Sequence, residues 1–194
     1  MNTDYNIHAL GILLDEACLG ERYYPLIPCK NALITGLQAF HCKTKNDAAA
    51  LTDADLAAIG LTDPGCIALF RRFLTLYDPN PQKFREIKKV TADPELQQAY
   101  TELYHLPGVK YTRASLYYQA GYRSIQDFVN TTPEEVRAKA TQAISEHSLP
   151  CIVPLSKEIR THIAVAKAFL WEQKQMHNID DIHIDKKTPP QTQA

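Results

Sequence analysis

Basic side chains stand next to two tight turns of this sequence. Lys110 and Arg113 follow the turn Pro107-Gly108, and Lys30 follows the proline-containing turn around Pro28. Amide groups at the start of a helix, together with the helix dipole, attract anions, and a nearby lysine or arginine strengthens that attraction. Pro107, Gly108, Lys110, Arg113 and Lys30 therefore form one candidate contact with nucleic-acid phosphate.

A second group of cations lies between the two turns. From Pro64 to Thr91 there are six basic residues and only two acidic ones. Such a local excess is typical of a surface that meets a polyanion, and it is also typical of a solvated helix face beside a linker. The six residues are Arg71, Arg72, Lys83, Arg85, Lys88 and Lys89.

Helical patterns account for most of the chain, so the sequence predicts an all-α fold. Residues 4–18 carry apolar side chains at helical spacing and are followed by Gly20, which indicates an N-terminal covering helix. A second helix is expected over about 110–120, ending at Gly121. A long C-terminal helix should begin at Ser156. No segment alternates in the way that a half-buried strand does.

The same helix signals occur twice, 80 residues apart. Two potential capping boxes, in which a hydroxyl precedes a carboxylate by three residues, recur at this offset. Self-similarity at a fixed offset favours duplication of one supersecondary unit. The matching pairs are Leu26 with Leu106, Lys30 with Lys110, Thr44 with Ser124, Asp47 with Asp127, Thr52 with Thr132, Asp55 with Glu135, and Leu56 with Val136.

Four segments follow from these patterns. Residues 1–78 should hold the covering helix and a degenerate first unit, and 93–176 the second unit. Residues 79–92 are expected to be a basic linker, because Pro79 and Pro81 interrupt the chain. Residues 177–194 are polar, contain Pro189-Pro190, and suggest a flexible tail.

The two turns and the repeated caps resemble the helix-hairpin-helix superfamily. More narrowly, they resemble an uncharacterised bacterial family of tandem helix-hairpin-helix-like units. The similarity covers about residues 25–60 and 92–172. It is closest at Leu106-Pro107-Gly108-Val109, at Ala120-Gly121, in the segments RSIQDF and TPEEV, and in the closing LPCIVPLSKEIRTHIAVAKAF. The superfamily implies DNA binding through backbone amides of the hairpin, whereas the narrower family implies no activity.

Two departures from the superfamily pattern bear on function. DNA-binding hairpins usually read Gly-x-Gly, but Lys110 occupies the second glycine position and the first hairpin, Ile27-Pro28-Cys29, has no glycine. Two hypotheses therefore stay open. The chain is a non-enzymatic module that binds DNA without sequence specificity, or it is a protein–protein adaptor that kept the fold and lost nucleic-acid binding.

Other chemistries have weaker support in the sequence. Asp127 follows Gly108 at about the distance of the catalytic aspartate in related DNA glycosylases, but Ser124 explains it as a capping residue. His41-Cys42 has no second pair at metal-ligand spacing. We therefore expect no catalytic residue, metal or cofactor. Five scattered cysteines, a net charge of −1 and no long apolar run favour a cytoplasmic protein that does not enter a membrane.

Overall fold

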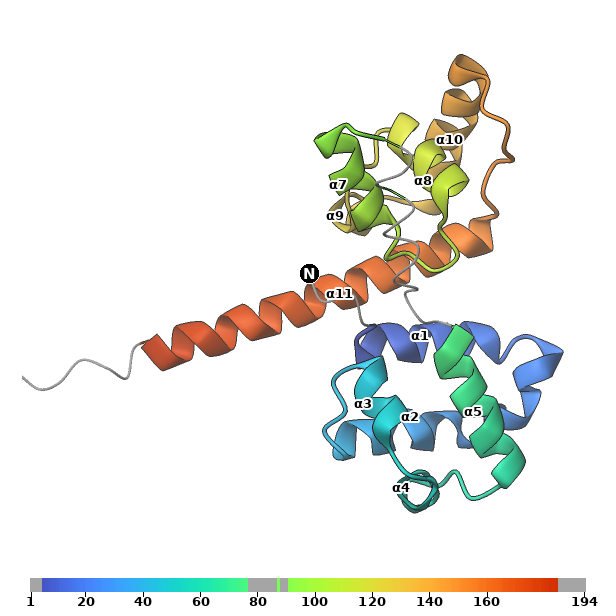
Figure 1. Ribbon diagram of the computed structural model, residues 1–194, viewed down its shortest axis with the longest axis vertical. Coiled ribbons are helices and arrows are strands. Elements are labelled where there is room, and N and C mark those ends of the chain that lie inside the picture. Colours follow the sequence, from blue (N-terminus) through green and yellow to red (C-terminus); the bar gives the residue numbers. More distant parts are fainter. Residues whose placement is uncertain (1–4, 77–86, 88–90, 185–194) are drawn as a thin grey trace, which may run out of the picture.

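The computed structural model describes residues 5–76, 87 and 91–184, and this part of the chain is all-helical, without strands (Figure 1). The expected all-α class is confirmed. The elements are α1 (Ile7–Ala17), the 3-10 helix η1 (Glu21–Cys29), α2 (Lys30–Ala39), α3 (Lys45–Ala50), α4 (Asp53–Ala58), α5 (Pro64–Leu76), α7 (Pro94–Leu103), α8 (Tyr111–Gln119), α9 (Ile125–Val129), α10 (Pro133–His147) and α11 (Ser156–Ile184).

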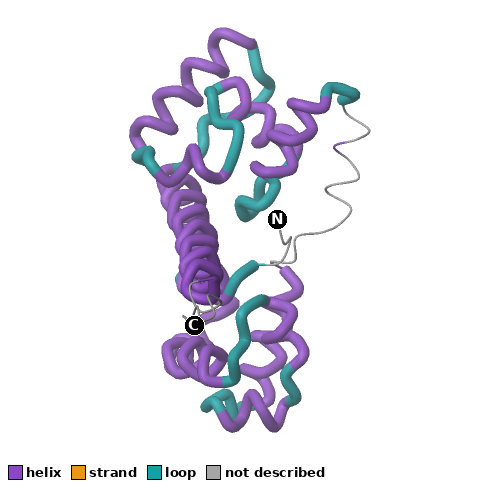
Figure 2. Tube along the Cα trace, turned by 90° about the vertical axis from the view of Figure 1, so that its left-hand side faces the viewer, coloured by secondary structure: helices purple, strands orange, loops and turns teal. Residues whose placement is uncertain are grey.

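The helices form two bodies with α11 between them (Figures 1 and 2). We call residues 7–76 the first unit and residues 94–147 the second unit. Helices α9 and α10 of the second unit pack on α11, and α1 of the first unit packs on α11 as well. The buried Asn6 donates from Nδ2 to the carbonyl of Ala168 at 3.4 Å, and the rings of Tyr5 and Phe169 lie 6.0 Å apart. Helix α1 therefore joins the units in addition to covering the first one.

The C-terminal helix is longer than the sequence suggested. A loose tail was expected from His177, but α11 continues to Ile184. The sequence offers a reason, because no glycine or proline occurs between Ser156 and Ile184 to stop the helix. Most of the predicted basic linker lies outside the described residues.

Corresponding capping bonds occur 80 residues apart. Asp47 Oδ2 accepts from the amides of Lys43 and Thr44, each at 2.9 Å. Asp127 Oδ2 accepts from the amides of Arg123 at 2.7 Å and Ser124 at 2.8 Å. Each carboxylate thus satisfies two amides that precede a short helix.

The caps at Thr52 and Thr132, which form the second matching pair, share only some of their hydrogen bonds. The Thr52 amide donates to Asp55 Oδ2 at 2.8 Å, and the Thr132 hydroxyl accepts from the Glu135 amide at 3.2 Å. The Glu135 carboxylate is held by the Thr131 hydroxyl and Lys139. The full capping box predicted at Thr132 is therefore replaced by a hydroxyl cap with a separate glutamate–lysine pair.

The ends of α2 and α8 also match. His41 has a φ of 57° and Gly121 a φ of 92°, so both take the left-handed conformation just past the helix. The Cys42 amide reaches back to the Leu37 carbonyl at 3.0 Å, and the Tyr122 amide to the Tyr117 carbonyl at 2.9 Å. These bonds are the helix-ending pattern that a left-handed residue permits.

The two turns before these helices differ. Pro28 lies inside η1, which runs directly into α2. In the second unit Gly108 has a φ of 73°, and the Val109 amide bonds the Leu106 carbonyl at 3.2 Å. A sharp glycine-dependent turn therefore precedes α8, whereas a 3-10 helix precedes α2.

Gly108→Val is expected to destabilise the protein by about 1–3 kcal/mol. A Cβ at Gly108 would meet no atom within 4 Å, so the cost comes from the left-handed backbone alone. Gly108→Asn is the control, because asparagine tolerates this conformation. If Gly108→Val melts together with the wild type, the turn assignment is wrong.

Gly36→Ala should cost about 1–3 kcal/mol through overpacking, while Gly11→Ala should be neutral or stabilising. A Cβ at Gly36 would lie 2.4 Å from Cβ of Ile59, whose position is fixed by its backbone. A Cβ at Gly11 would meet the Ile34 side chain at 3.7 Å, an ordinary contact. Denaturant unfolding of the two variants measures the difference, and equal stabilities would contradict the packing of α2 on Ile59.

Candidate functional site: the groove at the hairpin

A buried histidine of α11 is hydrogen-bonded to the hairpin of the second unit, which is the turn at Pro107-Gly108. His162 Nε2 lies 2.9 Å from the Pro107 carbonyl oxygen, and its Nδ1 lies 3.0 Å from the Tyr117 hydroxyl. A carbonyl oxygen can only accept, so Nε2 carries the proton and Nδ1 accepts from Tyr117. Both ring nitrogens of this 1% exposed residue are thereby satisfied.

Burial controls the ionisation of this pair. It lowers the pKa of His162 to about 4, since desolvation disfavours the imidazolium, with Arg113 as a smaller cause in the same direction. Burial also raises the pKa of Tyr117 well above its ordinary value. The imidazole is therefore neutral at pH 7 and serves as a fixed donor and acceptor.

Arg113 connects α8 to the start of α11. Its Nε lies 2.9 Å from Glu158 Oε1 and its Nη2 lies 3.3 Å from Oε2, so the guanidinium engages both carboxylate oxygens. Its Nη1 donates to the Ile152 carbonyl at 2.9 Å. The Arg113 side chain is only 18% exposed. The cation that was a candidate for phosphate is thus used to join two elements of the protein.

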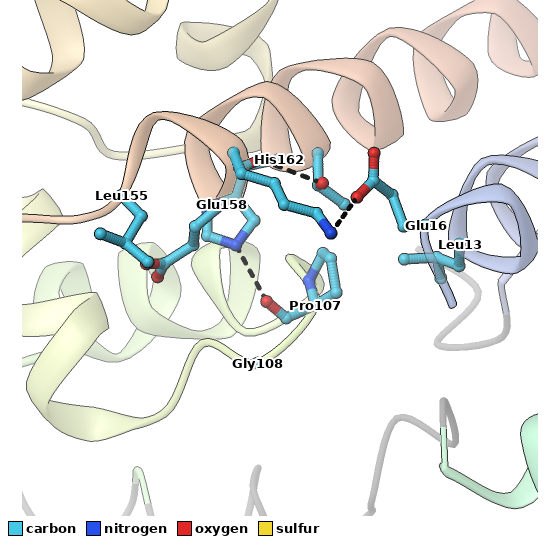
Figure 3. A pocket seen from close by; sticks show the side chains of 9 residues that line it. Leu13, Glu16, Pro107, Gly108, Leu155, Glu158 and His162 are labelled. Carbon is cyan, nitrogen blue, oxygen red and sulfur yellow. Dashed lines mark hydrogen bonds and ion pairs between the residues drawn. The ribbon is translucent and has the colours of Figure 1, made fainter. Parts of the chain in front are cut away.

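A groove opens where the hairpin, α1 and the start of α11 meet (Figure 3). Its volume is about 390 Å³, within the range of small-molecule and peptide side-chain sites. Across it, Lys157 Nζ of α11 lies 3.2 Å from Glu16 Oε2 of α1, an ion pair between α11 and the first unit. We call this feature the hairpin groove; it is lined by Leu13, Glu16, Pro107, Gly108, Leu155, Lys157, Glu158, Thr161 and His162.

The surroundings of the hairpin groove are apolar. Leu155 lines it and is 67% exposed, and Ile152, three residues earlier, is 76% exposed. Exposed leucine and isoleucine side chains close to a cavity are typical of protein-binding surfaces. Each charged residue that lines the groove has a partner of opposite charge: Glu16 pairs with Lys157, and Glu158 pairs with Arg113, which lies outside the lining.

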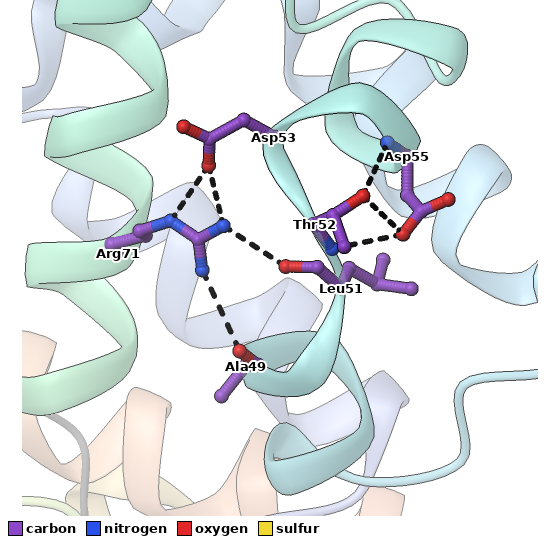
Figure 4. Close-up of polar contacts among 6 residues, drawn as sticks. All are labelled: Ala49, Leu51, Thr52, Asp53, Asp55 and Arg71. Atoms are coloured by element: carbon purple, nitrogen blue, oxygen red, sulfur yellow. Dashed lines mark hydrogen bonds and ion pairs between the residues drawn. The ribbon is translucent and has the colours of Figure 1, made fainter.

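The structure separates the other predicted phosphate contacts. Lys30 forms an ion pair with Asp15 of α1, and Arg71 forms one with Asp53 (Figure 4). Lys110 and Arg72 are exposed, Lys110 directly before α8 and Arg72 on α5. The remaining four, Lys83, Arg85, Lys88 and Lys89, lie outside the described residues.

The crowded tyrosines of the second unit are mostly core residues. Tyr100, Tyr104, Tyr117 and Tyr122 are each 3% exposed or less, whereas Tyr111 is 45% exposed. Their rings meet edge to face, for example Tyr117 and Phe128 at 5.0 Å. Most of these tyrosines are therefore too buried to stack on nucleic-acid bases.

Four of the five cysteines are poor nucleophiles. All five are free thiols. Burial raises the pKa of Cys18, Cys29, Cys42 and Cys66, so these thiols stay protonated at neutral pH. In the part of the chain that the structure describes, no group of three or more potential metal ligands comes together.

Sequence reasoning missed the residues that build the hairpin groove. His162 lies within the apolar stripe of Ile159, Ile163 and Ala166, and a histidine at such a position could have signalled a buried hydrogen bond. No sequence signal pairs Glu16 with Lys157, because 141 positions separate them and both are ordinary surface residue types.

Comparison with family models, curated proteins and solved structures finds no match to this chain. The described helices include none that combines the length and apolar character needed to cross a membrane.

Proposed function

We propose that this chain is a non-enzymatic protein-binding module made of two duplicated helix-hairpin-helix-like units. The duplication is supported by the corresponding caps at Asp47 and Asp127 and by the left-handed residues His41 and Gly121. One observation supports protein binding most strongly. Arg113, the cation beside the hairpin, is bound to Glu158 and the Ile152 carbonyl and is not directed at an outside phosphate.

The hairpin groove is the proposed binding site, and its ligand is a short apolar peptide segment of another protein. Leu13, Pro107 and Leu155 give it apolar walls, and its charged residues already have partners of opposite charge. A ligand therefore needs apolar side chains and no net charge to fit. Burial of such side chains supplies the main binding free energy.

Selection from a displayed peptide library tests this proposal. Apolar peptides that bind the full chain should lose binding to Leu155→Glu, which puts a charge at the edge of the groove. Leu19→Glu is the matched control, because Leu19 is 68% exposed but does not line the groove. Equal loss in both variants, or selection of no apolar peptide by the wild type, would contradict the proposal.

DNA binding remains the second candidate because of one observation. Lys110 is exposed at the start of α8, and its side chain does not cap that helix. Backbone amides at an uncapped helix start favour a phosphate, and a lysine strengthens this attraction. Lys110→Glu tests this contact, since it should weaken duplex binding if α8 contacts DNA.

A further inference from the structure

An exposed apolar segment connects α10 to α11 next to the hairpin groove. We call residues 149–155 the apolar segment; it reads Leu-Pro-Cys-Ile-Val-Pro-Leu and has no charged residue. It runs along the outer side of the second unit (Figure 1). Ile152, at 76% exposed, is the most exposed large apolar side chain of the described residues, and Leu155 is 67% exposed. Apolar side chains gathered at the surface in this way are typical of a contact with another molecule.

The apolar segment is held in one conformation. Pro150 and Pro154 fix their own φ angles, and each favours an extended backbone at the residue before it. The Ile152 carbonyl accepts from Arg113 Nη1 at 2.9 Å, which ties the middle of the segment to α8. A segment that is ordered before binding loses little conformational entropy when it binds.

The apolar segment has the chemistry that the hairpin groove requires. The groove has apolar walls, and each charged residue of its lining has a partner of opposite charge, so a neutral apolar ligand fits it. The segment is such a ligand within the same chain. Leu155 lines the groove of its own chain, whereas Ile152 is not part of that lining. Ile152 is therefore free to contact a second molecule.

A two-fold axis allows two such contacts to form together. Leu155 lies at the groove, and Ile152 is three residues away, at most about 10 Å along the chain. An axis close to Leu155 therefore brings the segment of each copy to the groove of the other. Such an interface uses the same patch on both copies and closes at two molecules. Because it buries two segments at once, it favours a second copy over an unrelated peptide with one segment.

We propose that the partner of the hairpin groove is a second copy of this chain, in a two-fold symmetric dimer in which each apolar segment occupies the groove of the other copy. This inference rests on the function proposed for the groove and names its partner. Arg113 binds both the Ile152 carbonyl and Glu158 of the groove lining, so segment and groove keep a fixed relation. Burial of Ile152 and Leu155 supplies the free energy of association.

Sedimentation velocity of the full chain over a range of concentrations tests the proposal. We expect a monomer–dimer equilibrium that weakens at least about a hundredfold in Ile152→Glu, because each substitution affects two symmetric contacts and a tenfold loss at each contact multiplies. Leu19→Glu is the matched control and should dimerise like the wild type, since Leu19 is 68% exposed and lies outside the segment and the groove. A wild type that stays monomeric at about 0.1 mM, or equal dimerisation of Ile152→Glu, would overturn the proposal.

Thr161→Lys tests the groove side of the same contact. Thr161 lines the groove and is half-buried, so a lysine there places a charge among the apolar walls and should also weaken the dimer. A mixture of Thr161→Lys and Ile152→Glu should associate, because one intact segment meets one intact groove and the other contact pairs opposite charges. A mixture that associates no more than the separate variants would contradict the reciprocal contact.

Peptide binding separates this inference from the function proposed for the groove. Ile152→Glu leaves the lining of the groove unchanged, so selected apolar peptides should bind this variant at least as tightly as the wild type. If the wild type is monomeric and binds these peptides at the groove, the second copy is wrong and the partner is a different protein. If the wild type dimerises through Ile152 but Thr161→Lys affects neither the dimer nor peptide binding, the groove is wrong as the site in both proposals.

Discussion

The free energy of unfolding is expected to fall by about 3 kcal/mol between pH 6.5 and pH 4 through His162 alone. The pKa of His162 is about 4 in the folded protein, and an unfolded histidine has its ordinary value near 6.5. Between these two values the unfolded chain binds more protons than the folded one. The contribution of His162 to the free energy of unfolding is therefore fully present above pH 6.5. It declines as the pH falls and levels off below pH 4.

His162→Gln isolates this contribution. Glutamine offers a donor and an acceptor but does not titrate, so the variant should lose about 3 kcal/mol less than the wild type over the same pH range. Burial lowers the pKa of His105 as well, to about 4, and its contribution is common to both proteins. Denaturant unfolding at several pH values measures the slopes. Parallel slopes for wild type and His162→Gln would show that His162 is not buried as a neutral group.

Arg113→Glu should destabilise the protein by about 3 kcal/mol at neutral pH, whereas Lys110→Glu should change stability by less than about 0.5 kcal/mol. The new carboxylate would face Glu158, whose side chain is 31% exposed, and the Ile152 carbonyl would lose its donor. Lys110 is exposed, so its substitution disturbs no packing.

The sequence predicts Lys110 and Arg113 as phosphate contacts at the surface, and substitution of such an exposed cation is expected to leave stability nearly unchanged. The ion pair of Arg113 removes that expectation. A charge exchange, Arg113→Glu with Glu158→Arg, should recover part of the lost stability. Coincident thermal melts of Arg113→Glu and wild type would contradict the pairing with Glu158.

Local signals explain which parts of the fold could be predicted. The caps at Thr44 and Ser124 and the stop at Gly121 depend on residues within a few positions of each other, and the structure contains all three. The helix start at Pro94 is equally local, since Asp93 Oδ1 accepts from the Glu95 amide at 2.9 Å. These interactions are specified by short sequence patterns.

Long-range pairing could not be predicted from the same patterns. The contact of α1 with α11 joins Asn6 to Ala168, and the hairpin groove brings Glu16 to Lys157. Each pair combines common residue types whose proximity depends on the final packing. Likewise, Arg113 and Arg71 are indistinguishable from free surface cations in the sequence, but Glu158 and Asp53 engage them in the fold.

The most direct test of the claim that the hairpin serves internal packing is a salt titration of the full chain with a generic DNA duplex. Phosphate contacts produce a steep fall of log K with log salt and strong binding at about 50 mM salt. We predict no shift of the duplex under these conditions. Binding at about 50 mM salt that weakens steeply with added salt, and that Lys110→Glu abolishes without changing the melt, would contradict the account.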